Sequence, residues 1–307
     1  MLNGLVKPLI KRNQLSLCQK KIPYDRRCGL LNNTGFTEGS FPTIYLVVSL
    51  VTGRLTARHL EPLVNKVRNK VAGWKVKTLS QAGQLTLIKH VLSCMATHLL
   101  AVLNVPQILL SKLNSILSTF FWGTHHGKPK RRWVSWLSIC KPINEGGLGI
   151  RDFNEMQRGM HMKLVWRLIT MDNLWAWFFR AKYVRDGNLV LAASKEIGSR
   201  LWKAMMQVFP EVHENTRVRI KEGNVPFWHV KWLSSGPLSV QVQDIANPLV
   251  KVKELWIGNV WDENALRDLV GENRAWEIMR SVMAGKEGSD VYMWEPNKNG
   301  IFTTASA

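Results

Sequence analysis

The feature that most constrains the fold of this chain is a set of three apolar stripes between residues 60 and 121, each with members three or four residues apart. Such spacing places each stripe on one face of an α-helix. Ser80 suits the N-cap of the second helix, and Pro106 separates the second helix from the third. Three amphipathic helices with short connections predict a helical bundle. The stripes are Leu60, Leu63, Val64, Val67, Val71 and Trp74; Leu85, Ile88, Leu92, Met95, Leu99 and Leu103; and Leu109, Leu113, Ile116, Leu117, Phe120 and Phe121.

The segments around these stripes are assigned from turn residues and shorter patterns. The first helix begins near Thr56 or restarts at Pro62, a residue that suits a first helical turn. Before it, residues 44–51 read as one strand, closed by a turn at Thr52-Gly53. Residues 218–232 predict a β-hairpin, and residues 290–303 predict the two strands of another. Further helices are predicted at about residues 153–170, 173–185, 197–209 and 263–284.

Composition and turn residues divide the chain into four segments. Residues 1–40 show no sustained period and predict a flexible basic leader. The bundle occupies residues 41–150, and a helical connector with a β-hairpin follows at 151–235. Residues 236–307 predict a linker, a helix and the beginning of a further module. The expected fold class is mainly α, a helical bundle followed by a helical connector and short β-hairpins.

Positive charge is the strongest indication of a partner. The chain has 42 Lys and Arg against 22 Asp and Glu, a formal charge of +20 that attracts a polyanion in a salt-sensitive way. Nucleic acid, RNA or DNA without sequence preference, is the expected partner. An anionic membrane surface ranks second to nucleic acid, and the prediction adopted is that the chain has no membrane partner. The longest apolar run also falls far short of the ~20 residues needed to span a bilayer.

The charge is concentrated in residues 54–90, where eight Lys and Arg stand against the single acid Glu61. Lys and Arg on a helical surface can neutralise phosphates without reading sequence, or can simply keep the surface soluble. We expect phosphate contact from these residues. They are Arg54, Arg58, Lys66, Arg68, Lys70, Lys75, Lys77 and Lys89.

A second basic segment covers residues 125–132 and adjoins Trp133 and Trp136. It could clamp phosphates beside stacking aromatic residues, as proteins that bind single strands do, or act as a nuclear-localisation patch. We expect instead that both tryptophans anchor the loop to the core, and that most of the 14 tryptophans are core residues. The loop then contributes a modest basic patch made of Lys128, Lys130, Arg131 and Arg132.

No catalytic residue and no metal site are predicted. His125 and His126 are adjacent and have no Cys or acid at ligand spacing. Cys94 is predicted to lie on an apolar helix face, where a buried inert thiol is expected, and no Ser or Cys sits in a nucleophile elbow. Asp152 and Glu155 fit a capping box better than an acid–base pair. The four cysteines are far apart, which predicts reduced thiols in an intracellular protein of the nucleus or cytoplasm.

Several short motifs occur in order along the chain: Thr52-Gly-Arg-Leu-Thr, Ala72-Gly-Trp-Lys, Leu79-Ser-Gln-Ala-Gly-Gln-Leu-Thr-Leu-Ile-Lys, Phe121-Trp-Gly, Trp133-Val-Ser-Trp136 and Glu145-Gly-Gly-Leu-Gly-Ile-Arg-Asp152. Together they resemble the region downstream of the catalytic palm in plant LINE-type (non-LTR) retrotransposon reverse transcriptases. Later motifs resemble the connector and the opening of that family's zinc-binding module, so that the resemblance covers residues 41–307. These are Gly223-x-x-x-Phe-Trp228 and Asp290…Trp294…Gly300-Ile-Phe302.

The resemblance implies a thumb-like bundle whose basic helices lie along a template–primer backbone. The family's polymerase chemistry depends on two adjacent aspartates which, with a third, hold two divalent metals. No Asp-Asp pair occurs in this chain, so the resemblance implies a non-catalytic fragment with no cofactor of its own, although an intact family polymerase would need Mg²⁺. Enzymatic activity would require a separate palm-bearing reverse-transcriptase polypeptide. The zinc ligands and any RNase H-like domain would be expected after Ala307.

The chain departs from the family pattern at two places. Tyr45-Leu-Val-Val-Ser-Leu50 lacks a Gly and a Pro that the family usually has, and His229 follows Phe227-Trp228 where an acid is usual. These departures suggest a decayed or truncated copy of an element. The alternatives are a protein-interaction scaffold or an inert remnant, in both of which the positive charge is incidental.

Overall fold

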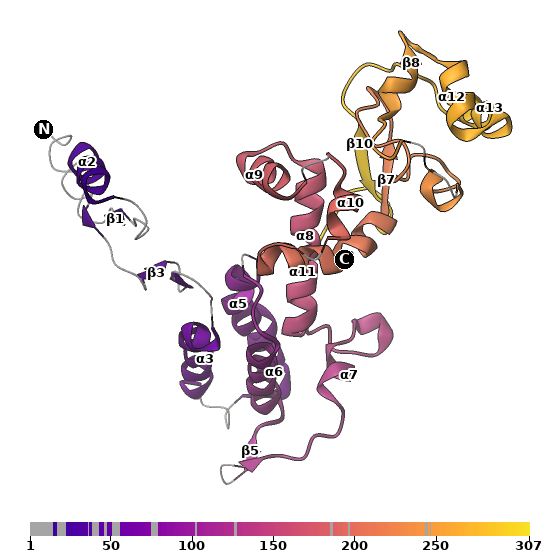
Figure 1. The fold of residues 1–307 in the computed structure, drawn as a ribbon. Helices are drawn as coiled ribbons and strands as arrows, with labels where there is room; N and C mark the ends of the chain where they lie inside the picture. Colours follow the sequence, from indigo (N-terminus) through magenta and orange to yellow (C-terminus); the bar gives the residue numbers. More distant parts are fainter. Residues whose placement is uncertain are drawn as a thin grey trace, which may run out of the picture. The chain divides into compact units, whose positions relative to one another are not determined.

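The fold is that of a computed structural model, which describes residues 15–16, 23–35, 37–38, 43–45, 48–50, 56–74, 79–101, 103–125, 128–184, 187–195, 197–242, 245 and 247–307. Two compact units divide the chain. Figure 1 labels their helices and strands. Unit 1 comprises Met1–Leu99 and Val105–Phe153, and unit 2 comprises Leu100–Asn104 and Asn154–Ala307. Helices dominate both units and the β structure consists of two-stranded sheets, which confirms the predicted fold class.

Helix α3 (Ala57–Ala72) is the first helix of the predicted bundle and packs against α6 (Gln107–Trp122). Thr56 is its N-cap, and the Thr56 N–H donates to Nδ1 of His59 at 3.1 Å, so the first of the two predicted starts is correct. Pro62 lies inside the helix. The predicted stripe faces the core, with these residues buried: Leu60, Leu63, Val64 and Val67.

The second predicted helix is divided by one π-helical turn. It consists of α4 (Gln81–Leu87), the π segment η2 (Ile88–Leu92) and α5 (Ser93–Leu100). Ser80 caps α4 as predicted, because its Oγ accepts the Gly83 N–H at 3.2 Å. The prediction that Cys94 is buried is wrong: its side chain is exposed. Cys94 lies two residues after the fully buried Leu92, about 200° around the helix and therefore on the solvent face.

Helix α6 begins directly after Pro106 and ends at Gly123, whose φ is 76°. The buried residues of the predicted third stripe are Leu109, Leu113, Leu117, Phe120 and Phe121. A short hairpin of β5 (Thr124–His125) and β6 (Lys128–Pro129) follows, and helix α7 (Trp136–Cys140) is capped by Ser135. A 3₁₀ turn, η3 (Ile143–Glu145), leads to the glycine-rich segment before α8.

The five described elements before α3 differ from the prediction. Helix α2 (Tyr24–Thr34) lies within the leader for which no regular structure was expected; the sequence signal is weak because the described helix surface is largely exposed. Strands β1 (Leu15–Ser16) and β2 (Thr37–Glu38) pair in parallel. The single strand predicted at 44–51 is wrong, because β3 (Thr43–Tyr45) and β4 (Val48–Leu50) pair as an antiparallel hairpin. A continuous β-branched run suits either strand and does not mark the reversal. The predicted turn at Thr52-Gly53 lies outside the described residues.

Unit 2 begins with helices that surround an apolar cluster containing Met162, Val165, Trp202, Met205 and Phe209. The helices are α8 (Phe153–Thr170), α9 (Leu174–Tyr183), α10 (Leu189–Ala193) and α11 (Arg200–Glu214).

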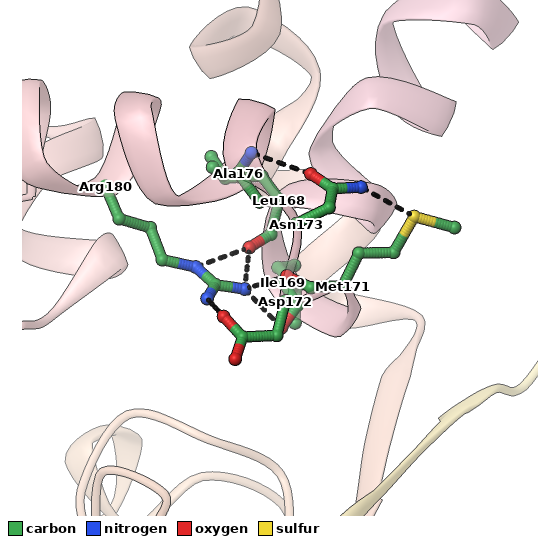
Figure 2. Close-up of polar contacts among 7 residues, drawn as sticks. All are labelled: Leu168, Ile169, Met171, Asp172, Asn173, Ala176 and Arg180. Carbon is green, nitrogen blue, oxygen red and sulfur yellow. Dashed lines mark hydrogen bonds and ion pairs between the residues drawn. The ribbon is translucent and has the colours of Figure 1, made fainter.

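The corner between α8 and α9 is closed by one side chain, that of Arg180 (Figure 2). Its guanidinium donates to the carbonyl oxygen of Leu168 from Nε at 2.9 Å and from Nη2 at 2.7 Å, and to that of Met171 at 2.6 Å. The Asn173 Oδ1 caps α9 by accepting the Ala176 N–H at 2.9 Å. Carbonyl groups that α8 leaves without helical partners are therefore satisfied by a cation, which also suits the negative end of the helix.

The rest of unit 2 is organised by strand β7 (Thr216–Arg219), which pairs antiparallel with β10 (Val291–Trp294). Each hairpin predicted for this part of the chain is borne out only in part: one of its strands is present, and one backbone hydrogen bond crosses its turn, from the Val218 N–H to the Lys231 oxygen at 2.9 Å and from the Trp294 N–H to the Gly300 oxygen at 2.8 Å. The strand ladder, however, joins β7 to β10. Residues 221–224 do turn, but the Asp290 carboxylate accepts the backbone N–H groups of Lys221, Gly223 and Asn224. This distant side chain fixes the turn after β7 beside the start of β10.

A second apolar cluster packs around Phe227, Trp228 and Trp232 and includes the final helices. The single helix predicted at 263–284 is two helices, because Gly271 adopts a φ of 80° between them. The remaining elements are η4 (Leu238–Val240), η5 (Val252–Leu255), β8 (Trp256–Ile257), β9 (Val260–Trp261), α12 (Glu263–Val270) and α13 (Glu272–Ser281). No helix among the described residues is sufficiently long and apolar to span a membrane.

Candidate nucleic-acid interface

Helix α3 presents a row of cations to solvent while its apolar stripe faces the core. All four of its Lys and Arg side chains are exposed, namely Arg58, Lys66, Arg68 and Lys70. The only acid of the helix, Glu61, is paired with Lys112 of α6 at 2.6 Å. Among the residues that the structure describes, no acid pairs with any of the four cations. Their charge is thus available to an external anion.

The cations lie on both flanks of α3. Lys66 and Lys70 border a shallow hollow whose lining includes the amide side chains of Asn65 and Asn69. Arg68 borders a second hollow of about 350 Å³ between α3 and α6, and its Nη1 donates to Asn65 Oδ1 at 2.9 Å. The exposed ridge of α3, defined here as Arg58, Lys66, Arg68 and Lys70, can therefore meet anions along the helix and on either side of it.

The second basic segment begins at the end of α6, beside the hollow between α3 and α6. Gly123 and Thr124 line the hollow that Arg68 borders. The Lys130 N–H donates to the Gly123 carbonyl oxygen at 3.1 Å, and its Cδ lies 3.9 Å from where a Cβ at Gly123 would be. Lys130 therefore lies against Gly123, which lines the same hollow as Arg68.

The remaining predicted residues have separate positions. Lys89 is only half-exposed, and its Nζ lies 3.5 Å from where a Cβ at Gly149 would be, so it lies against the glycine-rich segment rather than on the ridge. Lys128 belongs to strand β6, and Arg131 and Arg132 follow it as exposed residues. Outside the described residues lie Arg54, Lys75 and Lys77.

The expectation that Trp133 anchors the loop to the core is wrong. Its side chain is 75% exposed, and the guanidinium carbon of Arg131 lies 5.1 Å from its ring centroid. Trp136, by contrast, is half-buried. The missed signal is the run Lys130-Arg131-Arg132 immediately before Trp133, since three consecutive charged residues keep the adjoining backbone at the surface.

The expectation that most of the 14 tryptophans are core residues is met only in part. Three are exposed, namely Trp133, Trp177 and Trp276, and six are half-buried, namely Trp74, Trp122, Trp136, Trp166, Trp175 and Trp256. The five buried ones are Trp202, Trp228, Trp232, Trp261 and Trp294.

The described residues of unit 1 include a half-buried thiol, that of Cys140. Burial, with a smaller contribution from Asp152, raises the pKa of the Cys140 thiol to about 12, which makes it a poor nucleophile at neutral pH. Cys28, Cys94 and Cys140 are free thiols. Within the described part of the chain, no group of three or more His, Cys, Asp or Glu side chains is placed to hold a metal ion.

Comparison with known proteins gives two plant relatives, and no protein-family model matches the chain. A protein of Arabidopsis thaliana named "Putative ribonuclease H protein" is 31% identical over 258 residues, which cover 80% of this chain and 41% of that relative. An "Uncharacterized mitochondrial protein" of the same plant is 26% identical over 105 residues, 34% of this chain and 68% of that protein. The chain thus spans about two fifths of the first relative's length. These similarities relate the chain to plant proteins and are consistent with the plant retroelement proteins that its motifs resemble.

Proposed function

We propose that this chain binds the backbone of nucleic acids without sequence preference, through the exposed ridge of α3 and the basic residues Lys130, Arg131 and Arg132. The observation that carries the proposal is the row of four exposed cations on α3, for which the described residues supply no acid partner. Duplex and single-stranded nucleic acids are both dense polyanions, and binding gains free energy from the counterions that such cations release.

The biological setting that we propose is a LINE-type retrotransposon RNA-directed DNA polymerase, of which this chain is a non-catalytic, thumb-like part. The ordered motifs between residues 52 and 152 support it, as does similarity to a plant protein whose name refers to ribonuclease H. Because the chain spans only 41% of that relative, its ribonuclease H activity is not transferred to this chain. Polymerase activity would require a separate palm-bearing polypeptide, since the chain has no adjacent aspartates.

The test compares two variants that each remove four positive charges. The first replaces the ridge residues with glutamine, which preserves helix propensity. The second is a matched control of exposed lysines in unit 2. Affinity for a primer–template duplex and for a single strand is measured across a salt series. The ridge variant is Arg58→Gln, Lys66→Gln, Arg68→Gln and Lys70→Gln, and the control is Lys203→Gln, Lys253→Gln, Lys286→Gln and Lys298→Gln.

We expect the ridge variant to bind more weakly and to depend less on salt. Each lost phosphate contact flattens the slope of log affinity against log salt by about 0.9 for duplex DNA, so four contacts correspond to about 3.6 units. The control has the same net charge and should keep a slope near that of the wild type. Equal slopes for the two variants would show that only overall charge matters, and would contradict the proposed ridge.

One observation favours a second function, the docking of a protein. Helix α9 leaves Leu174, Trp177 and Phe178 exposed, and apolar side chains gathered on one helix are common at protein interfaces. This scaffold function would be favoured if the wild type binds nucleic acid only weakly and if both charge variants bind it as the wild type does.

A further inference from the structure

We propose that Trp133 is a platform on which a base of a single-stranded nucleic acid stacks, while Arg131 and Arg132 contact its phosphates. The inference rests on the proposed nucleic-acid binding and adds a specific substrate class, the unpaired strand. It also adds a contact to the base, which the cations of the α3 ridge do not provide.

The exposure of Trp133 is the first observation. With 75% of its side chain exposed, it is the most exposed of the described tryptophans, ahead of Trp177 at 63%. A large aromatic ring loses the free energy of burial when it stays in water, whereas an unpaired base supplies a flat surface that covers it. Val134 and Leu137, which follow Trp133 in the sequence, are exposed too.

The position of Arg131 is the second observation. Its guanidinium carbon lies 5.1 Å from the ring centroid of Trp133, within the distance of a cation–π contact. A guanidinium at that place occupies one face of the indole at most, which leaves the other face for a base. The same cation stands beside the ring where a phosphate of the stacked nucleotide needs a partner, and Lys130 and Arg132 extend the positive charge along the chain.

The backbone on both sides of Trp133 is anchored. Upstream, the Lys130 N–H donates to the Gly123 carbonyl oxygen at 3.1 Å. Downstream, Ser135 caps α7 by accepting the Ser138 N–H at 3.1 Å, and the buried Ile139 accepts the Leu148 N–H through its carbonyl oxygen at 2.8 Å. A ring held between two such points loses less conformational entropy on binding than one on a free loop.

The geometry favours a single strand over a duplex. In a duplex each base is stacked between its neighbours and offers no face to an indole, whereas a single strand can turn a base outward. Every base has an aromatic face, so the contact carries little sequence preference and agrees with the non-specific binding proposed for the ridge. The other ligand that an exposed aromatic residue could take is a protein surface, which the experiment separates from nucleic acid.

The test measures binding of Trp133→Ala, Trp133→Phe and the matched control Trp177→Ala to three oligonucleotides of equal length: a single strand, the same strand without bases, and a duplex. Stacking predicts that Trp133→Ala binds the single strand about 5- to 150-fold more weakly than the wild type. The abasic strand and the duplex should show no such difference. Trp133→Phe should keep most of the affinity, and Trp177→Ala should behave as the wild type.

The outcomes separate this inference from the proposed function. If Trp133→Ala binds the single strand as the wild type does while the α3 ridge variant has lost affinity, stacking is excluded and backbone binding stands. If the ridge variant matches its control but Trp133→Ala is weakened on the single strand alone, the ridge is excluded and stacking stands. Equal losses on the base-containing and abasic strands would overturn stacking, and so would a wild type that binds no nucleic acid.

Discussion

Gly147 occupies a place where no side chain fits. A Cβ at this residue would lie 1.9 Å from the carbonyl oxygen of Lys141, and real Cβ atoms do not approach backbone so closely. The close approach is maintained by backbone hydrogen bonds, because the Gly147 N–H donates to the Pro142 oxygen and the Gly149 N–H to the Lys141 oxygen, each at 3.0 Å. The second glycine of the Gly-Gly-Leu-Gly motif is therefore a steric requirement of the loop after α7.

We expect Gly147→Ala to lower the free energy of unfolding by roughly 3 kcal/mol, because the loop must open to admit the methyl group. Gly146→Ala is the matched control: Gly146 has a φ of 81° but nothing within 4 Å of its Cβ position. That substitution should cost about 1 to 2 kcal/mol from backbone strain alone. Urea unfolding followed by circular dichroism measures both, and a Gly147→Ala variant as stable as Gly146→Ala would contradict the steric argument.

At the scale of elements, Asp290 joins two strands that are far apart in the sequence. Its Oδ1 accepts the N–H groups of Lys221 at 2.7 Å and Gly223 at 3.0 Å, and its Oδ2 accepts that of Asn224 at 2.7 Å. Hydrogen bonds to a charged group are the stronger kind, so this carboxylate fixes the turn after β7 beside the start of β10. Two motifs of the sequence, one at Gly223 and one at Asp290, therefore meet in one structure.

Replacing the Asp290 carboxylate is expected to change both the stability of unit 2 and the pKa of Tyr292. Asp290→Asn should destabilise unit 2 by about 2 to 3 kcal/mol, because one charged acceptor becomes a donor facing other donors. Burial first, and the Asp290 charge second, raise the pKa of Tyr292 to about 12, so the variant should also lower that pKa.

Spectrophotometric titration of tyrosinate, with Tyr292→Phe to identify the signal, measures the pKa. Glu295→Gln is the control, since its ion pair with Lys231 is partly exposed and worth at most about 1 kcal/mol. An unchanged Tyr292 pKa in Asp290→Asn would refute the electrostatic contribution.

The comparison of sequence with structure shows what local pattern can and cannot predict. Helix α6 lies where its apolar period and Pro106 place it, because both signals are local, and α8 has the range predicted for it. The partner of β7 could not be predicted, since it is about 70 residues away in the sequence. In the candidate interface, the exposure of the α3 cations follows from helical period, whereas the contact of Lys130 with Gly123, which lines the hollow beside Arg68, depends on how α6 ends.

At the scale of the whole molecule, the proposed function separates binding from catalysis. Template-directed phosphoryl transfer requires carboxylates that hold two metal ions, and the chain has no adjacent aspartates. We expect that primer, template, nucleotides and Mg²⁺ give no extension with this chain alone, under conditions where binding of the same primer–template is measurable. An active reverse transcriptase in parallel reactions is the control. Extension that co-purifies with the chain would refute the non-catalytic part of the proposal.

One short segment of unit 2 lies within the sequence range of unit 1. Leu100–Asn104 belongs to unit 2 although the residues on either side of it belong to unit 1. Within this segment Leu100 is buried, and the Asn104 Oδ1 accepts Nε2 of Gln157 at 3.2 Å. A fragment that ends near residue 153 retains this segment and loses Gln157, while the complementary fragment has Gln157 without its acceptor. The connectivity therefore has a topological consequence: no single cleavage of the polypeptide yields both units with all of their residues.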